Sequence, residues 1–561
     1  MPVFKSPYPT LNIPSTETIW EWIFELPNLR TRQGSPDRAG GYINTETKER
    51  LSYPQVQDVA TSLSTALYHE HNLRAGDRVI IFSKNSIWYP VAMFAAIRLG
   101  AIASGASPFY TIDEMNHVLS VAQPSVIFTS TEGLPVALAS AEANGISTRN
   151  VILLEGRVEG TRSLADLISA GKAWTPQRQV AAYRVPPGKT NGEICAFLGF
   201  SSGTTGLPKG VMLSHRNVIA QCLQLDQVSA PDLTRVLAAL PFFHVTGLIH
   251  SLNFPAARNM EVAVMPQFTL EGMLAAVDEY KVEELLVVPP IIIRLVQASC
   301  VSQYNLSSLK RFFCGAAPLS KNVIAQLQQR FPHTGFKQGY GMTESCSAAT
   351  LCPPELYSYA NAHKCGVIVG NTELKIIDER GHELGVGEPG QILIRGPQVA
   401  MGYWQNPVAT AETFDADGFL HSGDQGMLDE RGLLVITDRL KELIKVNGVG
   451  VAPAELEDLL LNHAAVEDCG VASMPDDRAG ERPQAFVVAS GQPSRELGQQ
   501  LMEYVQKHKT REKWVYAIRF VDAIPKSASG KILRRQLRLS QQQEGHPEGL
   551  VVTLQEARAR L

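Results

Sequence analysis

Residues 200–210 read Phe200-Ser201-Ser202-Gly203-Thr204-Thr205-Gly206-Leu207-Pro208-Lys209-Gly210, and the apolar run Ile194-Cys195-Ala196-Phe197-Leu198 lies just ahead of them. Such a run is typical of a buried strand. In the turn that follows, glycines let the backbone approach a ligand closely. Successive free N–H groups can form an anion-binding nest, to which hydroxyls and Lys209 add donors and positive charge. The stretch therefore predicts a strand followed by a loop that holds a polyphosphate.

Three other interpretations compete for this stretch. A flexible glycine and serine linker needs no fixed lysine after a proline. A P-loop NTPase needs Gly-Lys five residues after the first glycine, where Pro208 stands instead. The segment from Gly199 to Gly203 does fit the nucleophile elbow of α/β-hydrolases, but an elbow continues straight into a helix, which the glycines and proline of residues 206–210 oppose. A serine hydrolase that uses Ser201 is the alternative from another class.

The composition is that of an ordinary globular protein with more than one domain. The 561 residues are 44% hydrophobic and 19% charged, with a net charge of −4. Since no long basic run occurs, we expect no nucleic-acid partner. The apolar runs are too short to span a membrane, and residues 1–7 lack the order of a signal peptide. The 8 cysteines form no Cys-x-x-Cys pair, which favours reduced thiols and argues against a zinc site.

Strand and helix patterns alternate in the first part of the chain. Helical spacing follows Ser52, residues 78–82 are typical of a strand, and a second helical stretch stops at Gly100. Thr111 and Glu114 have capping-box spacing, and residues 125–128 predict the next strand. This alternation predicts an α/β fold with doubly wound βαβ sheets.

The later part of the chain has a different pattern. Between Gly370 and Gly396, two apolar segments flank turns rich in glycine and glutamate, which predicts antiparallel strands or a small β-barrel. Beyond Asp438, a helix over 454–461 and a strand over 485–488 predict a smaller α+β unit. We therefore expect a large N-terminal domain, residues 1–438, that includes the barrel, and a C-terminal domain, residues 439–561.

A second dense motif is Gln338-Gly339-Tyr340-Gly341-Met342-Thr343-Glu344. A tyrosine between glycines can stack on a base while the backbone stays thin. Thr343 offers a hydroxyl to a phosphate, and Glu344 offers an oxygen to a hard cation. An exposed Thr-Glu pair is more often just a helix start, so the motif alone is weak. The related segment Gly315-Ala316-Ala317-Pro318 lies upstream.

Two further motifs follow. Asp424 in Ser422-Gly423-Asp424 and Arg439 in Thr437-Asp438-Arg439 have the residue types of a ribose grip, in which a buried carboxylate beside an arginine accepts two hydroxyls. Lys531 lies in the basic segment Ile524 to Arg535, which could also be a solvated loop.

Taken in order, these four motifs resemble the signatures of the adenylate-forming superfamily, which includes acyl-CoA synthetases, luciferases and peptide-synthetase adenylation domains. The likeness runs from Ile19 to Arg535 and is greatest to coumarate-CoA ligases and fungal acyl-CoA ligases. The resemblance implies two steps: a carboxylic acid and ATP form acyl-AMP and pyrophosphate, and CoA then displaces AMP to give a thioester. It also implies a small C-terminal domain that rotates between the steps about a hinge at Lys441.

The resemblance assigns residues to these steps. It implies catalytic roles for Lys531, which reaches the junction of carboxylate and phosphate, and for His244, Thr343, Glu344 and Lys445, with Glu344 holding Mg²⁺. The implied ATP and AMP contacts are Ser201, Ser202, Gly203, Thr204, Thr205, Lys209, Ala316, Gln338, Gly339, Tyr340, Thr343, Asp424, Arg439 and Lys531. The implied acid pocket consists of His244, Val245, Thr246, Gly315, Gly339 and Ser345.

The sequence departs from the family both in the acid pocket and at the thiol-binding site. Thr246 stands where hydroxycinnamate ligases carry a tyrosine, which leaves the acid open among aromatic, medium-chain and secondary-metabolite acids. Lys441, Lys445 and Gly448 are the implied CoA contacts. Gln267, Asn447 and Gly450 replace residues that relatives use on the thiol side, two of them cations. A carrier-bound pantetheine, or a luciferase-like oxidation of the adenylate, is therefore kept as an alternative to CoA.

The printed sequence ends Ala559-Arg560-Leu561. This tripeptide resembles the Ser-Lys-Leu signal that an import receptor reads, which predicts a peroxisomal location, with the cytoplasm as the alternative. A helix end is the simpler explanation of the same residues.

Overall fold

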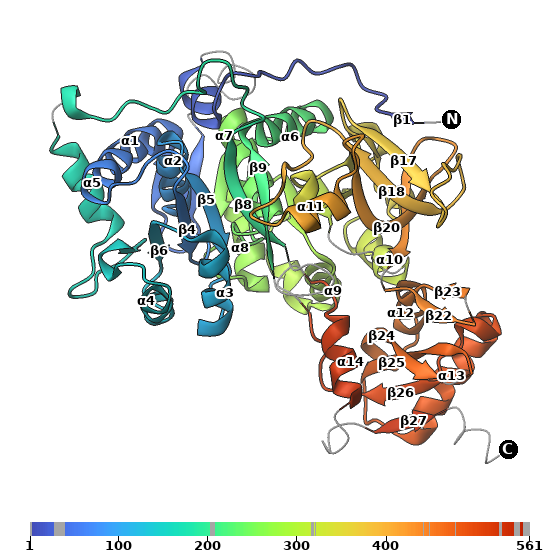
Figure 1. The fold of residues 1–561 in the computed structure, drawn as a ribbon. Coiled ribbons are helices and arrows are strands. Elements are labelled where there is room, and N and C mark those ends of the chain that lie inside the picture. The colour runs from blue at the N-terminus through green and yellow to red at the C-terminus, as the bar shows by residue number, and fades with distance from the viewer. Residues whose placement is uncertain are drawn as a thin grey trace.

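The computed structural model describes residues 3–26, 40–174, 176–201, 208–315, 319, 321–440, 442–447, 449–476, 478–526, 530–542 and 550–553. The tripeptide Ala559-Arg560-Leu561 lies outside these ranges, so the peroxisomal signal stays a prediction. Four sheets carry the described chain, three in the N-terminal part and one in the C-terminal part (Figure 1).

The first sheet has seven strands in the order β19-β9-β8-β5-β4-β6-β7. The strands from β8 to β7 run parallel, and β9 and β19 are antiparallel additions at the other edge. Their bounds are β4 Arg78–Phe82, β5 Ile102–Ala106, β6 Val126–Thr129, β7 Val151–Leu153, β8 Cys195–Ser201, β9 Lys209–Ser214 and β19 Gly402–Tyr403. The helices between and around them are α1 Tyr53–Glu70, α2 Tyr89–Arg98, α3 Ile112–Ala122, α4 Leu134–Ala143 and α5 Leu164–Lys172.

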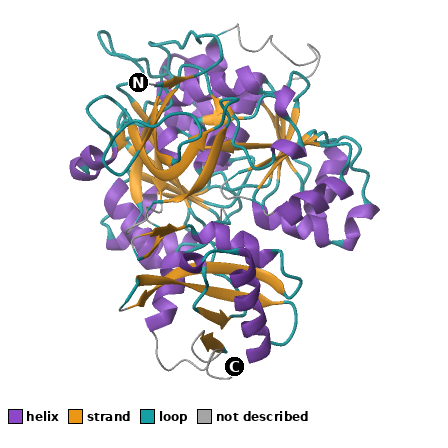
Figure 2. Cartoon of the chain, turned by 90° about the vertical axis from the view of Figure 1, so that its right-hand side faces the viewer, coloured by secondary structure: helices purple, strands orange, loops and turns teal. Residues whose placement is uncertain are grey.

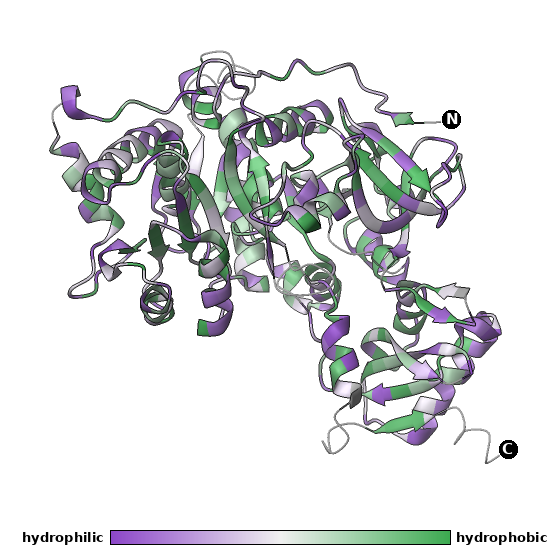
Figure 3. Ribbon diagram, viewed as in Figure 1, coloured by the Kyte–Doolittle hydropathy of each residue, from purple (hydrophilic) through white to green (hydrophobic). Residues whose placement is uncertain are grey.

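Alternate residues of β4 belong to two different cores, as a sheet covered on both faces requires. Val79 and Ile81 pack with α1 and α2, whereas Ile80 and Phe82 pack with α3 and α4. Figure 3 shows the result, with hydrophobic strands between helices whose outer faces are polar. The predicted doubly wound arrangement is confirmed for this sheet.

The second sheet has nine strands in the order β16-β15-β14-β13-β12-β10-β11-β2-β3, parallel from β14 to β2. The strands are β2 Gly41–Asn44, β3 Arg50–Ser52, β10 Arg235–Ala238, β11 Glu261–Val264, β12 Glu284–Val287, β13 Arg311–Cys314, β14 Gly335–Tyr340, β15 Thr350–Leu351 and β16 Val367–Ile368. One face carries α8 Leu270–Tyr280, α9 Pro289–Gln297 and α10 Lys321–Arg330, and the other packs toward the first sheet with α6 His215–Val228, the π-helix η4 Gly247–Asn253 and α7 Phe254–Arg258.

The third sheet is antiparallel and carries the segments in which a barrel or antiparallel strands were expected. Its order is β1-β17-β18-β20-β21, and among the described residues its end strands are not paired with each other. The bounds are β1 Phe4–Lys5, β17 Glu373–Ile377, β18 Gly390–Arg395, β20 Leu420–Leu428 and β21 Leu434–Arg439, with α11 Pro407–Thr413 beside them. The antiparallel strands are confirmed, and they form an open sheet of five.

The fourth sheet belongs to the C-terminal part and is set apart from the other three in both views (Figures 1 and 2). It contains β22 Ile444–Val446, β23 Val449–Val451, β24 Val466–Asp476, β25 Gly480–Ala489, β26 Ala517–Phe520 and β27 Val551–Thr553, with α12 Pro453–Leu461, α13 Arg495–His508 and α14 Arg534–Gln542. The expected boundary between residues 438 and 439 falls at the last residue of β21, and that boundary stays a prediction.

Local signals in the sequence account for several helix starts. Ser52 and Gln55 form a capping box at α1, and Thr111 and Glu114 form the predicted one at α3. Gly100, at φ +74°, takes the left-handed conformation that ends the segment of α2. No helix in the described part of the chain is long and apolar enough to cross a membrane.

Candidate active site

The glycine-rich stretch connects two paired strands. Ser201 is the last residue of β8, and it pairs directly with Lys209, the first residue of β9. The chain therefore returns as an antiparallel strand instead of continuing into a helix, and the nucleophile-elbow interpretation is wrong. Ser202, Gly203, Thr204 and Thr205 lie in the connecting segment, which is outside the described residues. The hairpin places a hydroxyl and an ammonium group side by side next to its connecting loop.

Glu344 is the point where three segments of the N-terminal part meet. Ser201 Oγ donates a hydrogen bond to Glu344 Oε1 over 3.1 Å, and Tyr403 Oη donates to the same oxygen over 2.9 Å. Lys209 Nζ lies 5.0 Å from the centroid of the Tyr403 ring. Burial, followed by the charge of Glu344, raises the pKa of Tyr403, so its hydroxyl stays a donor at neutral pH. Two hydroxyls thus fix one carboxylate beside the predicted phosphate loop.

Tyr403 is a site residue that sequence reasoning did not find. It lies on β19, a strand of two residues that pairs with β9. The sequence feature next to it is the glycine at position 402. Gly402 has a φ of +129°, and a Cβ added to it would lie 2.6 Å from Thr410 Cγ2. That signal marks a tight turn but does not say which distant strand the tyrosine joins.

Thr343 comes close to β8 because Gly199 has no side chain. A Cβ added at Gly199 would lie 2.8 Å from Thr343 Cγ2. Thr343 begins the short 3₁₀-helix Thr343–Ser345, which also presents Glu344. The phosphate-loop motif and the tyrosine motif are thus adjacent in space, as the predicted ATP site requires.

Tyr340, Asp424 and Arg439 form a second linked group. Tyr340 Oη donates to Asp424 Oδ2 over 2.7 Å, and Arg439 Nε lies 3.3 Å from Asp424 Oδ1. Asp424 on β20 and Arg439 on β21 are direct partners in the antiparallel ladder. Burial, and then the charge of Asp424, raise the pKa of Tyr340, which keeps its hydroxyl protonated. The three residues predicted to hold base and ribose are therefore in contact, and Asp424 is already oriented from both sides.

Lys531 reaches this group from the C-terminal part of the chain. Burial, and next the charge of Arg439, lower the pKa of Lys531 to about 8, against the opposite influence of Asp424, Glu442 and Glu344. The preceding residue, Gly530, lies so close to the start of α9 that an added Cβ would be 2.9 Å from Pro290 Cδ. The structure thus brings Lys531 near the two carboxylates of the predicted site.

The predicted acid-pocket residues lie around the start of η4 and the carboxyl ends of β13 and β14. Burial lowers the pKa of His244 to about 4, and its buried Nε2 has no hydrogen-bond partner among the described residues. Val245 and Thr246 are half-buried, and a Cβ added at Gly315 would meet no atom within 4 Å. Neutral and unpaired, His244 Nε2 is available to a ligand.

Of the other predicted site residues, two are buried and one is exposed, and the rest lie outside the described residues. Ser345 is buried, and its hydroxyl is bonded to the backbone of Met342. Gln338 is buried, and its Oε1 lies 3.9 Å from Cys365 Sγ. Lys445 is exposed on β22. Ala316, Lys441 and Gly448 lie outside the described residues.

With this geometry in view, the class of the protein is clear: the chain belongs to the AMP-binding enzyme family. The family's main domain matches residues 31–404, and the AMP-binding enzyme C-terminal domain matches residues 455–531. Among its relatives, 4-coumarate–CoA ligase 2 of Oryza sativa subsp. japonica is 36% identical over 560 residues, covering 96% of this chain and 94% of its own. 4-Coumarate–CoA ligase 5 of the same organism is 37% identical over 549 residues, covering 96% and 97%.

Solved structures agree with this assignment. ATP-bound MatB from Rhodopseudomonas palustris aligns with a TM-score of 0.81 at 25% identity, covering 94% of this chain and 99% of its own. The o-succinylbenzoate CoA synthetase MenE of Bacillus subtilis, in complex with its acyl-adenylate intermediate, aligns with a TM-score of 0.76 at 23% identity, covering 95% and 99%, and it supports the fold.

Proposed function

We propose that this protein is an ATP-dependent, AMP-forming acid–CoA ligase. In the first step, a carboxylate oxygen of the acid attacks the α-phosphorus of ATP, and the bond to pyrophosphate breaks, which yields acyl-AMP. In the second step, the sulfur of CoA attacks the acyl carbon, the thiol proton is lost, and AMP leaves. The observation that carries the proposal is Lys531, which comes from the C-terminal part and lies among the charges of Asp424 and Glu344.

The groups of the site have distinct roles in the first step. The ammonium of Lys531 stabilises the negative charge that develops on the oxygens between the carboxylate and the leaving pyrophosphate. Ser201 and Lys209, at the end of the hairpin, bind the phosphates together with the glycine-rich loop. Asp424 accepts the ribose hydroxyls, because Tyr340 and Arg439 hold its carboxylate in place.

Glu344 is the residue that would hold a magnesium ion. Its Oε1 is occupied by two hydroxyls, and its Oε2 accepts no hydrogen bond from the described residues. One carboxylate with phosphate oxygens and water is a usual environment for Mg²⁺, which supplies positive charge to the phosphates when bound. Among the described residues, no group of three His, Cys, Asp or Glu side chains could hold a metal by itself, in keeping with a site that needs the nucleotide.

CoA is the thiol that we propose for the second step, on the strength of its use by the relatives named above. Lys445 is exposed on β22, and Asn447, at φ +51°, forms the turn that follows. Gln267 and Asn447 supply no positive charge toward the CoA phosphates. We therefore expect a lower affinity for CoA than in a site with cations at these two positions. Each missing charged contact weakens binding by roughly 1.5–3 kcal/mol where it touches phosphate directly.

A panel of carboxylic acids tests the proposal. Each acid is incubated with ATP and Mg²⁺, with and without CoA, and AMP, pyrophosphate and thioester are measured. We expect acid-dependent AMP formation that continues for many turnovers only when CoA is present. Acid-dependent AMP release that is indifferent to CoA would refute the ligase assignment, as would the absence of AMP formation with every acid.

A further inference from the structure

A left-handed turn follows the 3₁₀-helix that presents Glu344, the residue that would hold magnesium. Cys346 and Ser347 have φ angles of +51° and +104°, and neither residue is a glycine. Residues with a side chain rarely adopt this conformation, which costs free energy unless the surrounding contacts maintain it. Because the turn directly continues the 3₁₀-helix Thr343–Ser345, the contacts that hold the turn also fix the position of Glu344.

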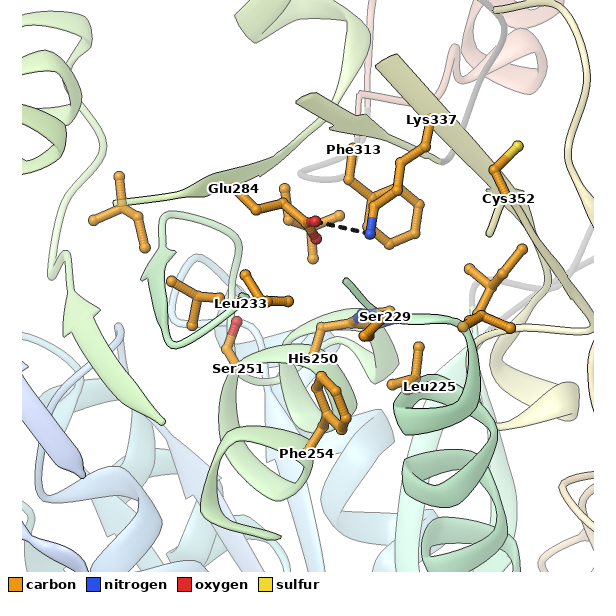
Figure 4. Close-up of a pocket in the computed structure, with 15 residues that line it drawn as sticks. Leu225, Ser229, Leu233, His250, Ser251, Phe254, Glu284, Phe313, Lys337 and Cys352 are labelled. Atoms are coloured by element: carbon orange, nitrogen blue, oxygen red, sulfur yellow. Dashed lines mark ion pairs between the residues drawn. The ribbon is translucent and has the colours of Figure 1, made fainter. Parts of the chain in front are cut away.

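Some of these contacts come from the immediate surroundings of the turn. The amides of Cys346 and Ser347 donate back to the carbonyl oxygens of residues 343 and 342, over 3.0 and 3.1 Å. His250 Nε2 lies 3.0 Å from Ser347 Oγ. His250 is on η4, and it lines a cavity together with Leu225 of α6 (Figure 4). The turn therefore lies close to both helices, η4 and α6.

Gln221 on α6 is the partner of the backbone amide that leaves the turn. Ala348 N donates to Gln221 Oε1 over 2.7 Å, and the glutamine is fully buried. Gln221 Nε2 donates in turn to Gln224 Oε1 over 3.3 Å. Gln224 Nε2 then donates to the carbonyl oxygen of Gly370 over 2.6 Å and to Gln398 Oε1 over 3.0 Å. Because a buried amide group without a partner is costly, this chain of hydrogen bonds favours one orientation of Gln221.

Asn217 holds a second segment that reaches Glu344. It lies on α6, one helical turn before the glutamine that bonds the turn, so the two amides share a face of the helix. Asn217 Nδ2 donates to the carbonyl oxygens of Pro397 and Val399, both over 2.8 Å. The amide of the next residue, Ala400, donates to the carbonyl oxygen of Glu344 over 2.9 Å. One face of α6 therefore fixes the chain both after Glu344 and beside it.

We propose that Asn217 and Gln221 are positioning residues for the binding of ATP with magnesium, because they hold the backbone of Glu344 in the orientation in which its carboxylate can receive the metal. The hydroxyls of Ser201 and Tyr403 fix one oxygen of that carboxylate, whereas α6 fixes the backbone that carries it. Without Gln221, a buried backbone amide would lose its partner, and the turn would relax from its unfavourable conformation. The inference rests on the proposed function and adds to it the residues that act through Glu344.

The test measures the binding of ATP to the full chain by isothermal titration calorimetry, without any acid, once with Mg²⁺ and once with EDTA. The quantity of interest is the factor by which Mg²⁺ lowers the Kd of ATP. In Gln221→Met, we expect this factor to fall roughly 5- to 10-fold, the effect of one lost hydrogen bond, while the Kd measured with EDTA stays the same. A residue that only supports the fold would change both Kd values by the same ratio or change neither, and either result would overturn the inference.

Two further variants of α6 sharpen this test. Gln221→Glu is the conservative variant: burial keeps its carboxyl group neutral, so one oxygen can accept from Ala348 N and the hydroxyl can donate to Gln224. This variant should keep the wild-type factor. Gln227→Met is the matched control, because Gln227 lies on the same helix and donates to the carbonyl oxygen of Pro9 over 3.0 Å. An equal fall in Gln227→Met and Gln221→Met would assign the effect to the stability of α6 and overturn the inference.

Asn217→Ala tests the second segment and decides if Gln221→Met does not fold, as seen by thermal unfolding. It removes the two hydrogen bonds to residues 397 and 399, so the factor should fall in the same direction. The outcomes also separate this inference from the proposed function. Acid-dependent AMP formation by the wild-type protein supports the ligase proposal, whatever the binding factors are. A factor that is unchanged in both variants, or a wild-type protein that binds ATP equally well with and without Mg²⁺, would show that α6 does not position a metal carboxylate.

Discussion

At the scale of single residues, the site depends on two carboxylates whose positions are fixed by tyrosine and serine hydroxyls and, for one of them, by an arginine. Glu344 is held by Ser201 and Tyr403 through one oxygen, and Asp424 is held by Tyr340 and Arg439 through its two oxygens. A carboxylate that is already oriented does not have to reorganise when ATP binds, and such preorganisation is a large part of electrostatic catalysis.

Replacing Tyr403 tests this orientation. Tyr403→Phe keeps the ring beneath Lys209 but removes the hydroxyl that donates to Glu344. We expect kcat/KM for ATP in acid-dependent pyrophosphate exchange to fall roughly 10-fold, because a hydrogen bond to a charged group is lost. Tyr359→Phe, which loses a hydroxyl contact with Thr334, is the matched control and should have little effect. Equal rates in the two variants would show that Tyr403 does not orient the site.

The ionisation of Lys531 predicts a pH dependence. Burial and Arg439 lower the pKa of Lys531 to about 8 in the protein without ligands. Because the proposed role of Lys531 in adenylation needs the ammonium form, kcat/KM should be constant below that pH and fall as the pH rises through it, since kcat/KM reports the ionisation of the free enzyme. Lys531→Arg stays charged, so whatever activity it retains should not fall in this range. A profile that is the same in both proteins would assign the fall to another group.

At the scale of elements, one arginine connects three segments of the C-terminal part. Arg534, at the start of α14, pairs with Glu457 on α12 and with Glu442 in the segment between β21 and β22. Its Nε also donates to the carbonyl oxygen of Val471 on β24 over 3.0 Å. Lys531 lies three residues before Arg534, so the same contacts fix the position from which Lys531 extends.

Removing Arg534 should destabilise this part of the protein. Arg534→Met leaves Glu457 buried without its partner, which costs about 3–5 kcal/mol of unfolding free energy. The measurement is denaturant unfolding of the full chain. Because the pKa of the buried Glu457 is already raised and should rise further without Arg534, the loss should be smaller at low pH. The double variant with Glu457→Gln should recover a large share of the lost unfolding free energy. If Arg534→Met unfolded at the same denaturant concentration as the wild-type protein, the account would be contradicted.

Elements were predicted best where the signal is local. The helical spacing after Ser52, the capping box at Thr111 and the apolar run before Ser201 all correspond to observed helices or strands. The pairing of β19 with β9 was missed because nothing near Tyr403 encodes a partner almost two hundred residues away.

At the scale of the whole molecule, the family resemblance predicted the arrangement of domains, while the motifs alone only predicted a nucleotide site. Contacts between the C-terminal part and the N-terminal part include two that involve α9 and α10 of the larger part. Gly530 lies against Pro290 at the start of α9, and Asp458 on α12 accepts a backbone hydrogen bond from Lys321 at the start of α10. Between these contacts, Lys531 is placed toward the carboxylates of the larger part.

The most direct test of this account compares the two half-reactions in Lys531→Met. Exchange of labelled pyrophosphate into ATP measures adenylation, and conversion of a pre-formed acyl-AMP to the CoA thioester measures the second step alone. We predict that the acid-dependent exchange falls roughly 100-fold or more, because the positive charge is lost where negative charge develops, while thioester formation stays close to that of the wild type. Exchange at a rate near that of the wild-type protein would contradict the central role given to Lys531.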